Sequence, residues 1–374
     1  MNRFPPNDII QLVGHAPRFD LAESVGPDLR LAEVLDAGGI ATLSQLALGY
    51  GSAAGDAPLR RVIGEMHSVD ADDVVITAGG MHALFLLAFA LCDRGSQAVV
   101  ASPLFPLARN ALTAVGVEAR TLPLSFDQRY QPDLSTLRRL LTPDTRLVSL
   151  ASPQNPSGVA LSPDTLREVH ALMQAHAPQA WLLVDETYRE AAYGADPIQP
   201  SAATLGPRVV CTGSLSKCHG APGLRIGWAI TRDAVLREQL VTAKFNTVIS
   251  CGRLDEAVAL SVLQQRERVV GTRRKLLADN LAITEAWVKR ESDRVEWVRP
   301  DAGALCCVRL RSECFDDAAV QRLNDALGRH SVRVGDGRWF AESPRVFRLG
   351  FGLLDRDGLA QALEAVSAAL REIT

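Results

Sequence analysis

Residues 212–228 read TGSLSKCHGAPGLRIGW and set a single lysine, Lys217, among glycine, serine and proline residues. Two hydroxyl side chains, Ser214 and Ser216, precede the lysine, and Arg225 follows it. The segment therefore combines a nucleophilic amine with hydroxyl and guanidinium groups that suit a phosphate. A glycine–proline turn lies between the lysine and the arginine, so both ends of the segment can face one site.

Alternating strands and helices surround this segment. Short apolar runs are followed by turn residues and then by helix-forming stretches. Strands that are apolar along their whole length and alternate with helices indicate an α/β fold with a doubly wound, mostly parallel sheet. The predicted strands are residues 73–77, 98–101, 117–122, 146–150, 181–185, 208–213 and 224–230, and the predicted helices are residues 81–91, 106–115, 134–141 and 163–176.

Polar and aromatic residues follow the ends of several predicted strands. Phe105 follows the strand that ends at residue 101, and Asn155 follows the strand that ends at residue 150. Asp185 closes WLLVD with Tyr188 just beyond it, and Lys217 follows RVVCTG. Ligands of doubly wound sheets bind at the carboxyl ends of the strands. We therefore expect these side chains to meet in one site.

A predicted strand also runs through Gly79 and Gly80 directly into an apolar helix that begins at Met81. Free backbone amides and the helix dipole favour a phosphate at such a junction. Glycines at strand-to-helix turns also occur for geometric reasons alone, so this signal has meaning mainly in combination with the lysine segment.

The pattern S-L-S-K-x-x-G-A-P-G-L-R-I-G around Lys217 resembles the cofactor-lysine signature of class I/II aminotransferases, the fold-type I enzymes that carry pyridoxal 5'-phosphate (PLP). The resemblance extends over nearly the whole chain, with the motifs in the family's order. It implies a large α/β domain that binds PLP and a smaller α+β domain.

The resemblance assigns a role to each residue at the strand ends. It implies that Lys217 holds PLP as a Schiff base and later moves a proton between the substrate Cα and the cofactor. It places Asp185 opposite the pyridine nitrogen and Phe105 against the cofactor ring. Tyr188 and Asn155 resemble the residues that hydrogen-bond the phenolic oxygen of PLP.

The phosphate ligands and the oligomeric state also follow from the resemblance. The implied phosphate site has Tyr50 reaching in from a neighbouring subunit, which requires a homodimer with shared active sites. Within one chain the implied ligands are the turn and helix start at Gly79, Gly80 and Met81, the hydroxyls of Ser214 and Ser216, and Arg225.

Arg348, in the sequence RVFRLGF, lies where the family keeps the arginine that binds the substrate α-carboxylate. A guanidinium can hold a carboxylate through two parallel hydrogen bonds. Asn155 is expected to contribute to the same substrate site. We expect a surface position for the nearby Arg345.

Two stretches depart from the family pattern. The residues of the expected N-terminal strip that closes over the substrate are Ala22-Glu23-Ser24-Val25-Gly26-Pro27, without the usual glycine and proline arrangement. Cys218 and His219 directly follow the lysine, and we expect a supporting or solvent-facing position for His219.

We predict a segment 1–40 that belongs to the small domain, a large PLP-binding domain over 41–285 and a C-terminal small domain over 286–374. A helix is expected to start near Pro27 and Asp28. A long helical stretch is expected from residue 231 to about 289, with a bend near residues 250–252.

Composition limits the classes of partner. The chain has 374 residues, of which 47% are hydrophobic, and a formal net charge of −3 without a basic run, which argues against nucleic acid or anionic lipid. The longest apolar stretch, residues 83–92, is too short to span a bilayer, and the N-terminus lacks a secretion signal, so we expect a cytoplasmic protein.

Seven cysteines are scattered without the spacing of a zinc site, so we expect reduced thiols and no metal. Cys306 and Cys307 are adjacent on a predicted strand and should point to opposite faces.

The leading hypothesis is a PLP-dependent aminotransferase that moves the α-amino group of an L-amino acid to a 2-oxo acid. A PLP-dependent lyase, decarboxylase or cyclase on the same scaffold is the alternative, because a fold does not determine one reaction. A PLP-binding sensor domain without catalysis ranks below both, since the chain carries no basic helix.

Overall fold

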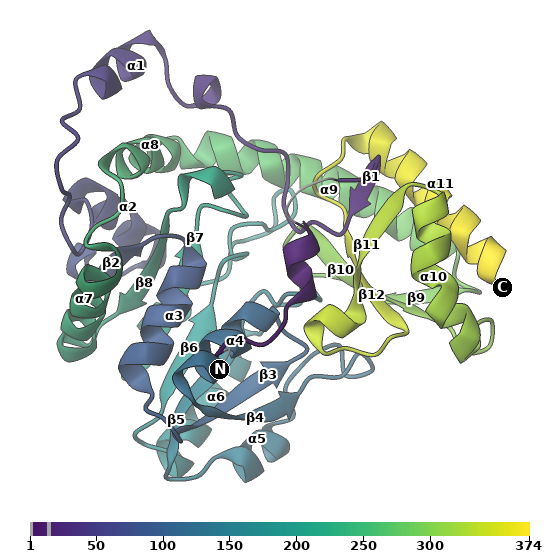
Figure 1. The fold of residues 1–374 in the computed structure, drawn as a ribbon, viewed down its shortest axis with the longest axis horizontal. Helices are drawn as coiled ribbons and strands as arrows, with labels where there is room; N and C mark the ends of the chain where they lie inside the picture. The colour runs from purple at the N-terminus through teal and green to yellow at the C-terminus, as the bar shows by residue number, and fades with distance from the viewer. Residues whose placement is uncertain (1–2, 13–15) are drawn as a thin grey trace.

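The computed structural model describes residues 3–12 and 16–374, which form two sheets and the helices that cover them (Figure 1). The larger sheet has the strand order β2-β8-β7-β6-β5-β3-β4. Strands β3 to β7 are parallel to their neighbours among themselves, and β8 is antiparallel to both β2 and β7. The predicted mostly parallel α/β sheet is confirmed. Its strands are β2 (Val74–Thr77), β3 (Gln97–Ser102), β4 (Glu118–Pro123), β5 (Thr145–Ala151), β6 (Trp181–Asp185), β7 (Val209–Ser214) and β8 (Gly227–Thr231).

Both faces of the large sheet are buried, as the continuous apolar strands predict. Val74 and Ile76 pack into one cluster, and Val75, between them, packs into the other. One face is covered by α2 (Ala57–His67), α5 (Leu134–Leu140), α6 (Pro163–His176) and α8 (Arg253–Gln264), and the other by α3 (Gly80–Leu91), α4 (Pro106–Val115) and α7 (Ala234–Val248).

The smaller sheet has the order β1-β11-β12-β10-β9 and combines an N-terminal strand with four strands from the C-terminal part of the chain. Its helical side packs against α9 (Arg266–Arg290), α10 (Asp317–Arg329) and α11 (Arg356–Ile373) (Figure 1). The strands are β1 (Phe19–Leu21), β9 (Val295–Val298), β10 (Leu305–Leu310), β11 (Val332–Asp336) and β12 (Val346–Gly350). The domain boundaries at residues 40 and 285 stay predictions, and residues 1–2 and 13–15 lie outside the described residues.

Three expected elements differ from the structure. The expected helix at Pro27 is absent: the chain stays irregular to a short 3-10 turn at Leu31–Glu33, and α1 (Ala37–Ser44) begins after its N-cap Asp36. The strand predicted over residues 224–230 begins only at Gly227, because Pro222–Leu224 form a 3-10 turn. The long helical stretch is broken into α7, α8 and α9.

The first of those helix breaks, after α7, lies at the predicted residues 250–252, whereas the second was not predicted. It lies at Gln265, between α8 and α9, where neither glycine nor proline marks it. Gln265 donates a side-chain hydrogen bond of 2.6 Å to the carbonyl oxygen of Val34. A tertiary contact to the N-terminal segment therefore accompanies a break that local sequence does not signal.

All seven cysteines are unpaired, as expected for reduced thiols, and every one except Cys314 is buried. Cys306 packs with the helices of the small sheet and Cys307 packs in a cluster of the large sheet, so their predicted opposite orientation is confirmed. In the part of the chain that the structure describes, no helix is long and apolar enough to cross a membrane.

Candidate active site

A cavity of about 390 Å³ lies at the carboxyl ends of the central parallel strands and is bordered by residues of both sheets. It brings together nearly all the residues predicted from sequence. The predicted residues that line it are Gly80, Met81, Phe105, Asn155, Asp185, Tyr188, Ser214, Ser216, Lys217, Arg225 and Arg348. Of the remaining two, Gly79 precedes Gly80 and packs against Arg225, and Tyr50 does not line the cavity.

The N-terminus of α3 forms one end of this cavity. Gly79 is its N-cap with a φ of 80°, in the left-handed region that favours glycine. A Cβ atom at Gly79 would collide with the guanidinium of Arg225, so the glycine lets this arginine approach the helix start. Gly80 and Met81 begin the helix, whose first amides have no partner within it. Together with the adjacent hydroxyls of Ser214 and Ser216, these donors fit a phosphate dianion.

Lys217 lies in the loop after β7, and the part of its surface that stays exposed lines the cavity. Its Nζ donates a hydrogen bond of 3.2 Å to Ser24 Oγ. Burial lowers the pKa of Lys217 to about 8; the positive charges of Arg348 and Arg225 act in the same direction, and Glu23 and Asp185 oppose it. An amine with this pKa is substantially neutral at mildly alkaline pH and can act as a nucleophile or base.

Asp185 is the last residue of β6, and Tyr188 follows in the next turn. Asp185 Oδ1 accepts hydrogen bonds from the backbone nitrogen of Thr187 at 3.1 Å and from its hydroxyl at 2.6 Å. Burial raises the pKa of Asp185, while the Thr187 bonds work against that rise. A carboxylate held in this way fits a cationic ring nitrogen as its partner.

Ser24 connects two of these groups and was missed in the sequence reading. Its Oγ accepts hydrogen bonds from Tyr188 at 2.9 Å and from Lys217 at 3.2 Å, and the serine is 3% exposed. Burial raises the pKa of Tyr188, so its hydroxyl stays protonated and donates. Ser24 belongs to the strip after β1, and the only sequence signal was its hydroxyl within a stretch that the family uses to cover the site.

Arg348 lies on β12, where its neighbours Phe347 and Leu349 point toward the helices of the small sheet and leave Arg348 on the cavity side. Its Nη1 donates to Asn155 Oδ1 at 2.8 Å, and its Nη2 donates to the Ala22 carbonyl oxygen. The ring of Phe340 lies 4.5 Å from the guanidinium carbon.

The Arg348 guanidinium is 2% exposed, and its Nε has no hydrogen-bond partner among the described residues. Burial lowers the pKa of Arg348. A buried cation with an unused donor fits an anionic ligand such as a carboxylate. Arg345, expected at the surface, is partly exposed and pairs with the exposed Asp317 at 2.5 Å.

Behind Lys217, the two residues that depart from the family pattern are both buried. Cys218 Sγ donates to the Thr187 carbonyl oxygen at 3.2 Å, and burial raises its pKa to about 12. His219 is 1% exposed, so the solvent-facing alternative is wrong, and its Nε2 lies 3.0 Å from Glu190 Oε2. Burial alone would raise the pKa of Glu190, but His219 and Arg266 outweigh it and lower the pKa to about 2.

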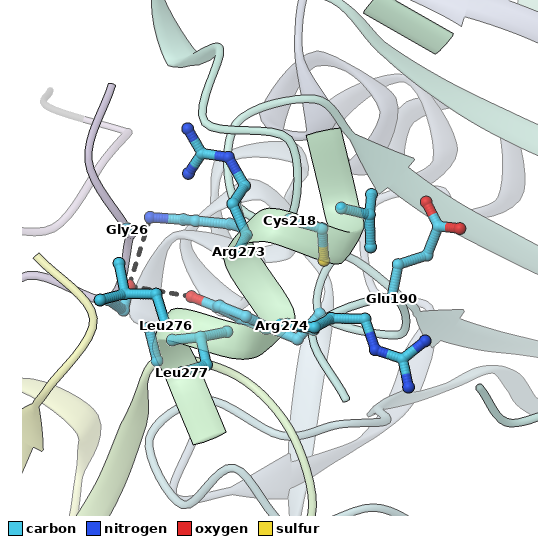
Figure 2. Close-up of a pocket in the computed structure, with 13 residues that line it drawn as sticks. Gly26, Glu190, Cys218, Arg273, Arg274, Leu276 and Leu277 are labelled. Atoms are coloured by element: carbon cyan, nitrogen blue, oxygen red, sulfur yellow. Dashed lines mark hydrogen bonds between the residues drawn. The ribbon is translucent and has the colours of Figure 1, made fainter. Parts of the chain in front are cut away.

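A second, small cavity of about 20 Å³ lies beside these residues (Figure 2). Gly26, Cys218 and Glu190 line it together with residues of α9, and Arg273 and Arg274 are the charged residues among the latter. A space of this size holds about one water molecule. The back of the lysine loop is therefore closely packed against α9, which limits where Lys217 can move.

Tyr50 is 84% exposed and does not line the cavity of its own chain. Its role as a phosphate ligand from a second subunit stays a prediction. The neighbouring Gly51 is tied to Ser250, after α7, through a backbone-to-hydroxyl hydrogen bond of 3.3 Å.

Comparison with known proteins identifies a family and several relatives of this chain. Residues 16–366 match the family described as aminotransferase class I and II. The chain is 30% identical to capreomycidine synthase of Streptomyces vinaceus, over 89% of this chain and 83% of that protein. It is 28% identical to arginine–pyruvate transaminase of Pseudomonas aeruginosa, over 87% of this chain and 83% of that protein.

Solved structures with the same fold include a PLP-dependent aminotransferase from Streptococcus suis, with a TM-score of 0.90, 23% identity and coverage of 100% of this chain and 99% of that one. The PLP-dependent cyclase OrfR has a TM-score of 0.87 and 28% identity, with coverage of 100% and 99%. The fold is thus shared by proteins that catalyse different reactions.

Proposed function

Because the chain belongs to the aminotransferase class I and II family of PLP-dependent enzymes, we propose that it is an aminotransferase that transfers the α-amino group of an L-amino acid to a 2-oxo acid. One observation carries this proposal: Lys217 and Arg348 line the same cavity. The reaction requires an amine that exchanges a proton with the substrate Cα. It also requires a cation that binds the α-carboxylate attached to the same carbon.

The residues present fit PLP. Lys217 would hold it covalently, Arg225 and the α3 N-terminus would bind its phosphate, and Asp185 would pair with its ring nitrogen. Phe105 would pack against the ring. When bound, PLP supplies an electron sink that stabilises negative charge developing at the substrate Cα.

The chain's own residues then orient the substrate and move the proton. Arg348, held by Asn155, binds the α-carboxylate and fixes the position of Cα. The Lys217 amine, with a pKa lowered to about 8, accepts the Cα proton when neutral and returns it when charged. Ser24 and Tyr188 hold that amine through the shared hydroxyl.

A cyclase, lyase or decarboxylase reaction is the second candidate. The observation that favours it is the likeness to capreomycidine synthase at 30% identity and to the cyclase OrfR at 28%. All these reactions start with the same Cα chemistry, so the same lysine and arginine would serve them.

The test uses the PLP-loaded protein with a panel of L-amino acids and a 2-oxo acid acceptor. Mass spectrometry should detect a new 2-oxo acid and a new amino acid in equal amounts, and Lys217→Ala should abolish both. Arg348→Ala should lower kcat/KM by about 100-fold, which corresponds to about 3 kcal/mol, whereas the matched variant Arg345→Ala should retain it. Release of ammonia or carbon dioxide, or formation of a cyclic product, without amination of the 2-oxo acid acceptor would support the second candidate instead.

We also propose that the enzyme is a homodimer with shared sites. Large apolar side chains are exposed around Tyr50 and on the helices that follow the large sheet, where a second copy could cover them. They include Leu48 at 83% exposed, Phe245 at 55% and Leu254 at 47%.

A further inference from the structure

The charged residues that line the large cavity do not all have a role in the proposed reaction. Lys217, Arg225 and Arg348 account for the positive charges, and Asp185 accounts for one negative charge. Glu23 is the remaining charged residue among those that line the cavity. Neither the cofactor nor the α-carboxylate of a substrate needs a second carboxylate at this position.

Glu23 lies in the strip after β1, between two residues that hold the reactive groups. The carbonyl oxygen of Ala22, before it, accepts a hydrogen bond from Arg348, and the hydroxyl of Ser24, after it, accepts one from Lys217. These bonds tie the residues on both sides of Glu23 to the site. Its negative charge is close enough to oppose the burial-induced lowering of the pKa of both Lys217 and Arg348.

Glu23 is half-buried, and its carboxylate has no side-chain hydrogen bond or salt bridge within residues 3–12 and 16–374. Besides Lys217 and Arg348, Arg333 is a positive charge close enough to interact with it. Asp20, three residues earlier on β1, is in contrast fully engaged, with Oδ2 at 2.6 Å from Arg333 Nη2. Glu23 is thus available to a ligand, while the neighbouring carboxylate serves the fold.

The remaining walls of the cavity are largely apolar. Leu104 and Leu107 lie near the start of α4, Leu84 lies on α3, and Ile9 and Leu12 belong to the N-terminal 3-10 turn. Such walls suit an unbranched chain of methylene groups. The other polar lining residues are Ser149, Gln154 and Thr187, and the side chains of Gln154 and Thr187 already donate to Pro103 and Asp185. Beyond Lys217, Arg225 and Arg348, the lining supplies no cation for a second acidic group on the substrate.

We propose that the amino-acid substrate carries a cationic side chain, a guanidinium or ammonium group on a methylene stem, and that Glu23 binds this cation. The inference rests on the proposed function for the position of the α-carboxylate at Arg348. A charge-assisted hydrogen bond stabilises the matching substrate. A neutral substrate side chain leaves the Glu23 carboxylate unpaired, and an acidic one is repelled by it. This penalty makes the enzyme discriminate against such substrates.

The test compares L-arginine with L-citrulline, which has the same shape but an uncharged ureido group, using the PLP-loaded enzyme. We expect kcat/KM to favour L-arginine by about 30-fold or more, in line with the loss of one charged hydrogen bond. Glu23→Gln should reduce this preference at least tenfold, mainly through KM, and Glu23→Asp should keep most of it. Asp28→Asn, which changes an exposed carboxylate just after this strip and outside the cavity, is the matched control.

Binding gives an independent readout, because the rise in the unfolding temperature of the PLP-loaded protein on addition of L-arginine should exceed that with L-citrulline only when Glu23 is present. Equal preference in the wild type, or an unchanged preference in a folded Glu23→Gln, would overturn the inference. Turnover of neutral donors alone would then leave the aminotransferase proposal intact. Conversion of L-arginine to a product without amino transfer would sink that proposal and support the role of Glu23.

Discussion

At the scale of single residues, the ammonium group of Lys217 lies in surroundings that disfavour its charged form. Burial and two nearby arginines lower its pKa from 10.5 to about 8. An equal change in a fully buried group corresponds to about 3 kcal/mol. Because part of Lys217 faces the cavity, we discount this to about 2 kcal/mol.

We therefore expect the cofactor-free Lys217→Met variant to be more stable than the cofactor-free wild type at pH 7. Below pH 8 the lysine is charged in the folded and unfolded chains alike, so the folded state carries the whole penalty. Between pH 8 and 10.5 the unfolded chain binds more protons, and wild-type stability rises relative to the variant. Urea unfolding at several pH values should show a gap of about 2 kcal/mol at pH 7 that narrows above pH 8 and closes only above pH 10.5.

Lys289→Met on α9 is the control, because Lys289 is exposed and its replacement removes no charge from the interior. A gap for Lys217→Met that stays constant from pH 7 to 10 would contradict the proposed burial of the charge.

Sequence patterns could place Lys217, Asp185 and Arg348, because each stands next to an apolar strand in a recognisable motif. Ser24 and Glu23 could not be assigned in the same way. Their strip has no periodicity, and the Ser24 contact joins residues 193 positions apart. The solvent-facing alternative for His219 was wrong for the same reason, since its partner Glu190 lies on a different loop.

At the scale of elements, the start of α3 depends on a close approach between a backbone and a side chain. Gly79→Ala would introduce a Cβ atom into the space that Arg225 occupies. We expect the affinity for PLP to fall about tenfold to 100-fold, the range of one lost charged hydrogen bond. The affinity for pyridoxal, which has no phosphate, should change little. Equilibrium titration of the cofactor-free protein with both compounds measures the two effects.

Gly95→Ala is a matched control for backbone strain. Gly95 has a φ of 86°, close to that of Gly79, but no atom lies within 4 Å of the added Cβ. Gly95→Ala should lose about 1 kcal/mol of stability through backbone strain alone, whereas Gly79→Ala adds the collision with Arg225 and should also weaken PLP binding. Equal affinities in the two variants would exclude the steric link to Arg225.

Elements with strong apolar continuity were predictable, and those set by tertiary contacts were not. The strands of the large sheet were identified because both of their faces are buried. The expected helix at Pro27 failed because the backbone there bonds to other parts of the chain: the Leu29 amide donates to the Gly220 carbonyl oxygen, and the Pro27 carbonyl oxygen accepts from Arg273. The break at Gln265 had no local signal for the same kind of reason.

At the scale of the whole molecule, the position of Tyr50 allows a sharp test of shared sites. Alone, Lys217→Ala should be inactive, and Tyr50→Ala should be impaired at limiting PLP. Mixed dimers of the two would contain one intact site, with Lys217 from one chain and Tyr50 from the other. Unfolding and refolding an equal mixture should recover up to about a quarter of the wild-type activity, since half of the dimers are mixed.

Light scattering of the wild type establishes first whether two chains associate. Tyr50→Phe serves as the control, because it keeps the ring and removes only the hydroxyl that would reach the phosphate. A monomer, or mixing that recovers no activity, would rule out the crossed arrangement while leaving the site within each chain as described.

The distribution of the thiols has a practical consequence for following this protein in solution. Six of the seven cysteines are buried, and burial raises the pKa of Cys92 to about 11 and that of Cys218 to about 12, so these thiols are poor nucleophiles. Cys314 is partly exposed, lies in the turn before α10 and does not line the cavity. A fluorophore can therefore be attached at one defined point of the native chain, next to the small sheet, without engineering and without occupying the site around Lys217.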